Sequence, residues 1–112
     1  MWYILAVWIE WADEDAEHIA TRSRRYPSAL DITTGWTQEA VNDDYAVVID
    51  PFPGSRIGAA AFVGYSPSAG RVLVVIAYLH VDGRWHGRSA WPATGRNLAL
   101  YEKRLKDDKQ RR

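Results

Sequence analysis

The segment RVLVVIAYLHV, residues 71–81, constrains the fold more than any other part of this chain. Its β-branched and aromatic residues favour an extended strand, and the Asp82-Gly83 pair that follows favours a tight hairpin turn. We therefore expect a central strand over 71–81 that turns back directly into a strand over 84–90. Strands joined by so short a turn pair antiparallel, so the sheet around them should be antiparallel.

Shorter apolar runs and helix signals place the other elements around this hairpin. The acidic residues at 13–17 favour the positive end of a helix, which should end before Pro27. The run over 2–11 is apolar on both sides, so we expect a strand that is buried on both faces or paired near the centre of the sheet. The expected elements are strands over 2–11, 46–50 and 59–66, and helices starting at Asp13, at Thr33 or Thr34, and at Thr94, the last of roughly ten residues.

This order predicts an α+β fold, with a small antiparallel β-sheet and helices packed mainly on one face. The length of 112 residues fits one domain, which we place at residues 1–106, followed by a charged C-terminal tail at 107–112. The chain has no cysteine, which excludes a disulfide framework and thiolate metal sites and fits a cytoplasmic protein. No run approaches the roughly 20 apolar residues needed to cross a membrane, so we expect no membrane partner.

The charges are divided unevenly between the two halves of the chain. Residues 1–50 carry 3 basic and 10 acidic residues, a balance of −7, whereas residues 51–112 carry 11 basic and 4 acidic residues, a balance of +7. This polarity indicates that the second half could meet an anionic partner. Much of the positive charge lies in the terminal KRLKDDKQRR, so a solvated helix end explains the pattern equally well.

Four segments, taken in order, resemble the BrnT group of the RelE-like ribonuclease toxins. They are IEWADEDAEHIA, TQEAVNDDYAVVIDPFPGS, VGYSPSAGRVLVVIAY and RSAWPATGRNLALYEK. The resemblance covers about residues 8–103 and rests on the pattern and order of the elements. It implies a RelE-like fold and the toxin component of a type II toxin–antitoxin system.

The same resemblance implies an activity and partners. RNA would be the substrate of a metal-independent endoribonuclease that needs no cofactor. A cognate antitoxin, usually of the ribbon-helix-helix type, would neutralise the toxin, and operator DNA would be contacted only through the toxin–antitoxin complex.

The chain departs from the family pattern at two places. Trp91 and Pro92 stand where the family has an Arg-Lys pair, and residues 97–100 replace an arginine cluster. These departures keep open a second hypothesis, a catalytically inactive toxin-like binding module that acts only in complex with an antitoxin or DNA-binding partner. A third is a stand-alone structural or oligomerising domain, which the six Trp and six Tyr residues would also fit.

Cleavage of RNA without a metal needs a base, an acid and a cation that stabilises the phosphate. Arg84, His86 and Arg88 alternate along one expected strand, so their side chains should share one face of the sheet. We take them as the candidate catalytic residues, although three alternating polar residues also describe a solvent-facing strand. His80 and His18 fit solvated positions, and we expect no metal site.

Three residues are candidates for RNA binding. Arg96 matches the family pattern and could hold phosphate. Trp91 could stack on a base or serve as the anchor that an antitoxin helix covers. Tyr101 also matches the family pattern, although Leu98, Tyr101 and Leu105 equally fit the buried face of a helix.

Overall fold

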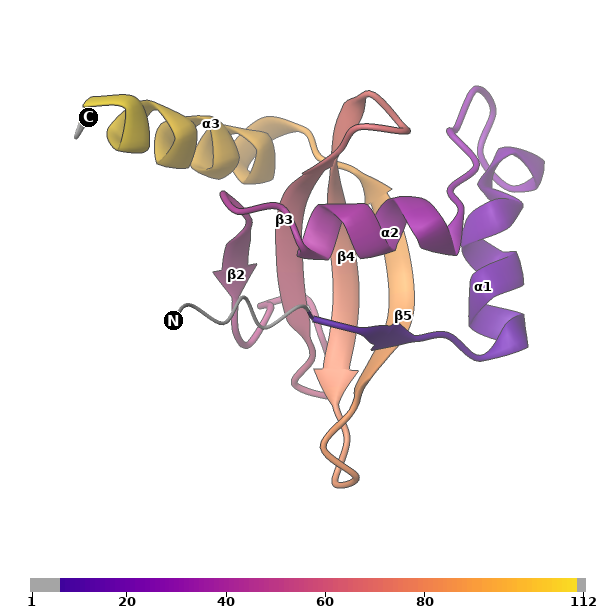
Figure 1. Ribbon diagram of the computed structural model, residues 1–112. Helices are drawn as coiled ribbons and strands as arrows, with labels where there is room; N and C mark the ends of the chain where they lie inside the picture. The colour runs from indigo at the N-terminus through magenta and orange to yellow at the C-terminus, as the bar shows by residue number, and fades with distance from the viewer. Residues whose placement is uncertain (1–6, 111–112) are drawn as a thin grey trace.

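The computed structural model describes residues 7–110, which form one five-stranded sheet in the order β1-β5-β4-β3-β2 with helices around it (Figure 1). The α+β class expected from the sequence is confirmed. In chain order the elements are β1 (Ile9–Glu10), α1 (Asp13–Ala20), the 3₁₀ helix η1 (Arg22–Arg24), α2 (Thr34–Val41), β2 (Val47–Ile49), β3 (Ala60–Ser66), β4 (Arg71–Leu79), β5 (Trp85–Pro92) and α3 (Gly95–Gln110).

Strand β4 lies in the middle of the sheet, as its sequence predicts. It pairs antiparallel with β3 on one side and with β5 on the other, so that Val74 lies opposite both Val63 and Trp91. A bulge at Arg88 interrupts the β4–β5 ladder, because Ile76 pairs with Ser89 and the next residue of β4 pairs with Gly87. The two hairpins β3–β4 and β4–β5 therefore form the antiparallel centre of the sheet.

The expectation of a buried N-terminal strand over 2–11 is wrong for the residues that the structure describes. Strand β1 has two residues, lies at the sheet edge and runs parallel to β5, and the side chain of Trp8 is 66% exposed. Side chains of α2 and of its C-cap residue replace a strand partner here: Asn42 Oδ1 accepts from the Val7 N–H at 2.7 Å, and Gln38 Oε1 accepts from the Ile9 N–H at 3.1 Å. The part of the expected strand at 2–6 lies outside the described residues.

Helices α1 and α2 enclose a core on one face of the sheet, and α2 crosses that face in Figure 1. The Thr33 hydroxyl caps α2 by accepting the Trp36 N–H at 3.1 Å. Helix α2 then approaches β3 so closely that a Cβ atom at Gly64 would lie 1.9 Å from the carbonyl oxygen of Ala40. Helix α2 can therefore pack this closely against β3 only because residue 64 has no side chain.

Helix α3 packs against the opposite face, so the expectation of helices mainly on one face holds for α1 and α2 only. Its Tyr101 is 4% exposed and belongs to a second core with Val63 and Val74. The helix continues to Gln110, so it is longer than the ten residues expected, and residues 107–110 of the expected tail are helical. Within residues 7–110, no helix has the length and apolar character needed to cross a membrane.

Candidate functional site

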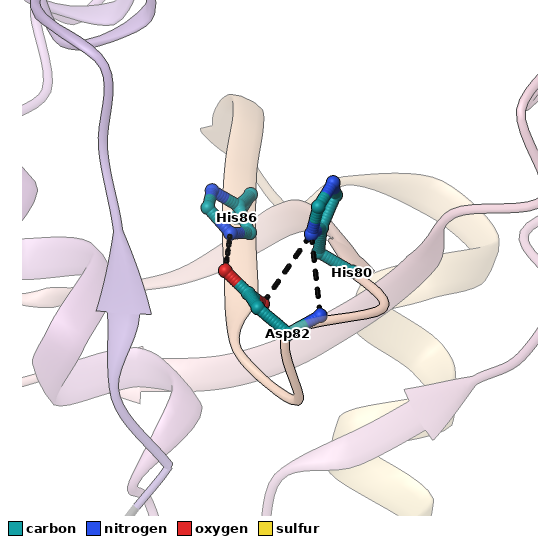
Figure 2. A group of neighbouring side chains, drawn as sticks. All are labelled: His80, Asp82 and His86. Atoms are coloured by element: carbon teal, nitrogen blue, oxygen red, sulfur yellow. Dashed lines mark hydrogen bonds and ion pairs between the residues drawn. The ribbon is translucent and has the colours of Figure 1, made fainter.

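The β4–β5 turn gathers His80, Asp82 and His86, which we call the hairpin cluster (Figure 2). Asp82 lies between the two imidazoles: its Oδ1 is 3.5 Å from His80 Nδ1, and its Oδ2 is 3.4 Å from His86 Nε2. The ring centroids of His80 and His86 are 5.2 Å apart. The sequence indicates a turn here but not the cluster. Alternation relates only residues of the same strand, whereas His80, Asp82 and His86 come together through the turn between two strands.

Backbone and ring contacts hold the hairpin cluster in place. The Arg84 N–H donates to Asp82 Oδ1 at 2.8 Å, and this hydrogen bond is the main cause that lowers the pKa of the Asp82 carboxyl. The His86 ring stacks on Tyr78, with centroids 5.4 Å apart and planes 22° apart. The tip of the hairpin therefore presents an ionised carboxylate beside two oriented imidazoles.

The three candidate catalytic residues lie at this end of β5, in different settings. His86 lies against Tyr78, and the Arg88 guanidinium lies 5.9 Å from the centroid of the same ring. Arg84 is turned toward the edge strand, where its Nη1 is 3.6 Å from Glu10 Oε1. The structure thus brings His86 and Arg88 to one aromatic ring and pairs Arg84 with a carboxylate.

The three candidate RNA-binding residues do not gather around His86. Trp91 lies five residues further along β5, about 16 Å at the usual strand rise. Arg96 is exposed in the first turn of α3. Tyr101 lies in the core and donates its hydroxyl to Asp43, so its ring has a structural role and does not offer a face to a base.

A second, larger site surrounds Trp91, which is partly exposed and lines two adjacent surface hollows of about 520 and 270 Å³. Both hollows also share Arg22, and we call the combined region the Trp91 surface. Its residues come from α1, η1 and the loop after it, and from the adjacent ends of β4 and β5: His18, Arg22, Arg25, Tyr26, Ser28, Ala29, Leu30, Arg71, Ser89, Trp91, Pro92 and Thr94.

The smaller hollow of the Trp91 surface is lined by two aromatic residues and two arginines. The guanidinium carbons of Arg22 and Arg25 each lie 6.0 Å from the centroid of Tyr26, whose side chain is 57% exposed. Arg22 donates to the Leu30 carbonyl at 3.0 Å, and Arg25 donates to the His18 carbonyl at 2.5 Å. Since a guanidinium has five N–H donors, most donors of each arginine remain for a ligand.

The positive charge of the Trp91 surface is not neutralised by direct ion pairs. Arg71, exposed at the start of β4, adds a third guanidinium to those of Arg22 and Arg25. Among the described residues, no carboxylate oxygen lies within 4.0 Å of these three groups. Asp31 lies close enough to Arg22 to experience its charge, but its carboxylate is held by the backbone N–H and hydroxyl of Ser23.

Trp91 is a candidate from the sequence, whereas the residues that line the two hollows with it were not among the candidates. The signal that points to them is the local run Arg22-Ser23-Arg24-Arg25-Tyr26, which concentrates all the positive charge of residues 1–50 beside an aromatic residue. Nothing in the sequence relates this run to Trp91, because the two meet only through the packing of α1 beside β5.

When compared with known proteins, the chain matches no family model, no curated protein and no solved structure.

Proposed function

We propose that this chain is the toxin component of a type II toxin–antitoxin system with a RelE/BrnT-like fold, and that it binds single-stranded RNA at the Trp91 surface. The smaller hollow carries the RNA-binding part of this proposal, since it brings Tyr26 and Trp91 together with Arg22 and Arg25. The assignment as a toxin is supported by the order of the sequence segments that resemble the BrnT group.

The chemistry of the smaller hollow suits an unpaired nucleic acid strand. Proteins bind such strands by stacking exposed bases on aromatic side chains while basic side chains contact the phosphates. Each stacked base contributes about 1–3 kcal/mol, and arginine offers paired donors that match phosphate oxygens. Tyr26 can stack without any rearrangement of the core, because most of its side chain is already exposed.

Cleavage of the bound RNA is the second part of the proposal and is assigned to the other end of β5. His86 and Arg88 each contact the Tyr78 ring there, so a group that can transfer a proton and a cation that can hold phosphate share one aromatic neighbour. An RNA strand that follows β5 from Trp91 toward the hairpin would reach both regions.

Two observations favour the second candidate function, a binding module without catalysis. The guanidinium of Arg84 is engaged by Glu10, and His86 lies about 16 Å along β5 from Trp91. On this hypothesis the chain binds RNA or its antitoxin and acts only within a complex that contacts operator DNA through the antitoxin.

Expression in a bacterial host, alone and with the adjacent gene, tests the proposal. We expect growth arrest with loss of intact bulk RNA, relieved when the adjacent gene is co-expressed. Arrest that is lost in His86→Ala, while the variant stays folded and binds RNA, supports cleavage at the hairpin end. Soluble expression of the native chain without arrest would contradict the toxin proposal and favour the binding module.

A further inference from the structure

We propose that the hairpin cluster binds one divalent transition-metal ion, with His80 Nδ1, one oxygen of Asp82 and His86 Nε2 as its ligands (Figure 2). This inference stands on the geometry of the β4–β5 turn and does not depend on RNA binding at the Trp91 surface. It adds a site that the sequence did not indicate.

The spacing of the three donor atoms fits a metal ion. With bonds of about 2.0–2.1 Å in a tetrahedral site, two ligand atoms stand about 3.3 Å apart. Asp82 Oδ1 lies 3.5 Å from His80 Nδ1, and Asp82 Oδ2 lies 3.4 Å from His86 Nε2, so each imidazole already has one carboxylate oxygen at nearly this distance. All three donor atoms lie within 4.8 Å of one another. His80 Nδ1 accepts the Asp82 N–H at 3.3 Å, so an ion at this nitrogen would replace that hydrogen bond.

The surroundings of the cluster are those of an ordered ligand set. A backbone N–H of Arg84 holds Asp82 Oδ1, and the Tyr78 ring fixes the plane of His86, which is the kind of support that orients metal ligands. The side chains of His80, Asp82 and His86 are 47%, 42% and 31% exposed, so an ion can reach them and keep water in its open positions. The positive charge of the Arg84 guanidinium would repel a bound cation. Glu10 partly offsets this charge, because its Oε1 lies 3.6 Å from Arg84 Nη1.

The donor types select the class of ion. Two imidazole nitrogens and one carboxylate suit Zn²⁺, Co²⁺ or Ni²⁺, whereas Mg²⁺ and Ca²⁺ require mostly oxygen ligands. The chain has no cysteine and three histidines, and two of the three lie in this cluster. A cation on His86 Nε2 would occupy the ring nitrogen that faces Asp82. His86 could therefore not bind a metal ion and transfer a proton through this nitrogen at the same time.

Calorimetric titration of the untagged chain with Zn²⁺, supported by Co²⁺ absorption spectra, tests the proposal. We expect one ion per chain, and no comparable binding of Mg²⁺. His80→Gln and His86→Gln should each weaken Zn²⁺ binding by more than the roughly 100-fold seen for changes that only support ligands. Asp82→Asn should also weaken it, although an amide oxygen can still accept the Arg84 N–H. His18→Gln, which alters the one histidine outside the cluster, should bind as the native chain does.

A measurement on the native chain guards against variants that fail to fold. Addition of Zn²⁺ should shift the ring resonances of His80 and His86 in NMR spectra and leave those of His18 in place. Zn²⁺ should also raise the melting temperature of the native chain and of His18→Gln, because an ion that binds only the folded state stabilises it. Absence of stoichiometric binding, equal affinity in His80→Gln and His86→Gln, or shifts centred on His18 would each overturn the proposal.

Discussion

The Tyr101 hydroxyl donates a hydrogen bond to Asp43 Oδ2 at 2.5 Å and so ties α3 to the loop that follows α2. The same carboxylate oxygen accepts the Tyr65 N–H at 2.7 Å. Tyr65 lies in β3 after Val63, the last residue of β3 that pairs with β2. Burial, with Asp43 as the second cause, raises the pKa of Tyr101 above its ordinary value of 10.0, so the hydroxyl remains a donor at neutral pH. One carboxylate therefore joins three segments of the fold.

Tyr101→Phe tests whether this residue acts through the fold. Loss of a hydrogen bond to a carboxylate should lower the free energy of unfolding by about 1–3 kcal/mol and the melting temperature by roughly 4 °C or more. RNA affinity should not change, because the ring is buried. Thermal unfolding and RNA titration check both points, with Tyr65→Phe as a control on an exposed tyrosine. An RNA-binding defect in a folded Tyr101→Phe would restore this residue as a binding candidate.

Gly64→Ala should be the more damaging of two glycine substitutions. Its new Cβ would meet the Ala40 carbonyl oxygen at 1.9 Å, so the backbone of α2 or β3 must move, at a cost of about 3 kcal/mol or more. Gly35→Ala is the matched control, because its Cβ would meet only Thr33 Oγ1 at 3.7 Å and alanine favours a helix by up to roughly 1 kcal/mol. Urea unfolding of both variants measures the contrast. Equal stability would mean that α2 does not pack on β3 as described.

Glu39 should make the stability of the fold dependent on pH. Hydrogen bonds from the Ser66 hydroxyl, and then from the Ser68 hydroxyl and N–H, lower the pKa of Glu39 below 4.5. A carboxyl with a lowered pKa in the folded state contributes its full stability above about pH 5, and this is lost as the pH falls through the folded-state pKa.

Glu39→Gln isolates this contribution from those of other carboxyls. We expect the variant to be about 1 kcal/mol less stable than the native chain at pH 7, with a difference that shrinks toward pH 3. Thermal unfolding of both proteins over this range measures it. If the difference in stability between the two proteins stays constant with pH, then the hydrogen bonds from the serines do not favour the ionised form of Glu39.

Arg71→Gln tests the electrostatic part of RNA binding. Each phosphate contact to a single strand contributes about 0.7 to the slope of log affinity against log salt concentration. The variant should therefore bind RNA more weakly, with a slope smaller by about 0.7. Lys109→Gln removes one charge near the far end of α3, about 21 Å along the helix from Gly95, and should leave the slope unchanged. Identical slopes in all three proteins would remove Arg71 from the RNA site.

Local patterns in the sequence predicted the centre of the sheet, and contacts between distant segments decided the rest. The β4–β5 hairpin is encoded by a β-branched run and the Asp82-Gly83 turn, both of which act over a few residues. The N-terminal strand was mispredicted because Gln38 and Asn42, some thirty residues away, bind its backbone in place of a strand. Helix α3 continues beyond its expected end because Arg104, Leu105, Lys106, Lys109 and Gln110 are good helix formers, which outweigh the weaker Asp107 and Asp108.

The candidate site was predictable to a similar extent. Alternation along β5 predicts one face for Arg84, His86 and Arg88; in the structure His86 and Arg88 each lie against Tyr78, whereas Arg84 is paired with Glu10. The position of Asp82 beside His86 depends on the shape of the turn, and the approach of Tyr26 to Trp91 depends on how α1 packs against β5. Neither relationship follows from spacing in the sequence.

The most direct test of the account compares RNA binding by the native chain, Tyr26→Ala and Tyr65→Ala in fluorescence anisotropy titrations with a labelled single-stranded RNA. Tyr65 is the matched control, because it is also exposed but lies beside Glu39, Asp43 and Asp44. Loss of one stacked base costs about 1–3 kcal/mol, so Tyr26→Ala should bind about 5- to 150-fold more weakly, whereas Tyr65→Ala should bind as the native chain does. Equal affinity of Tyr26→Ala and the native chain, or no binding by the folded native chain, would contradict RNA recognition at the Trp91 surface.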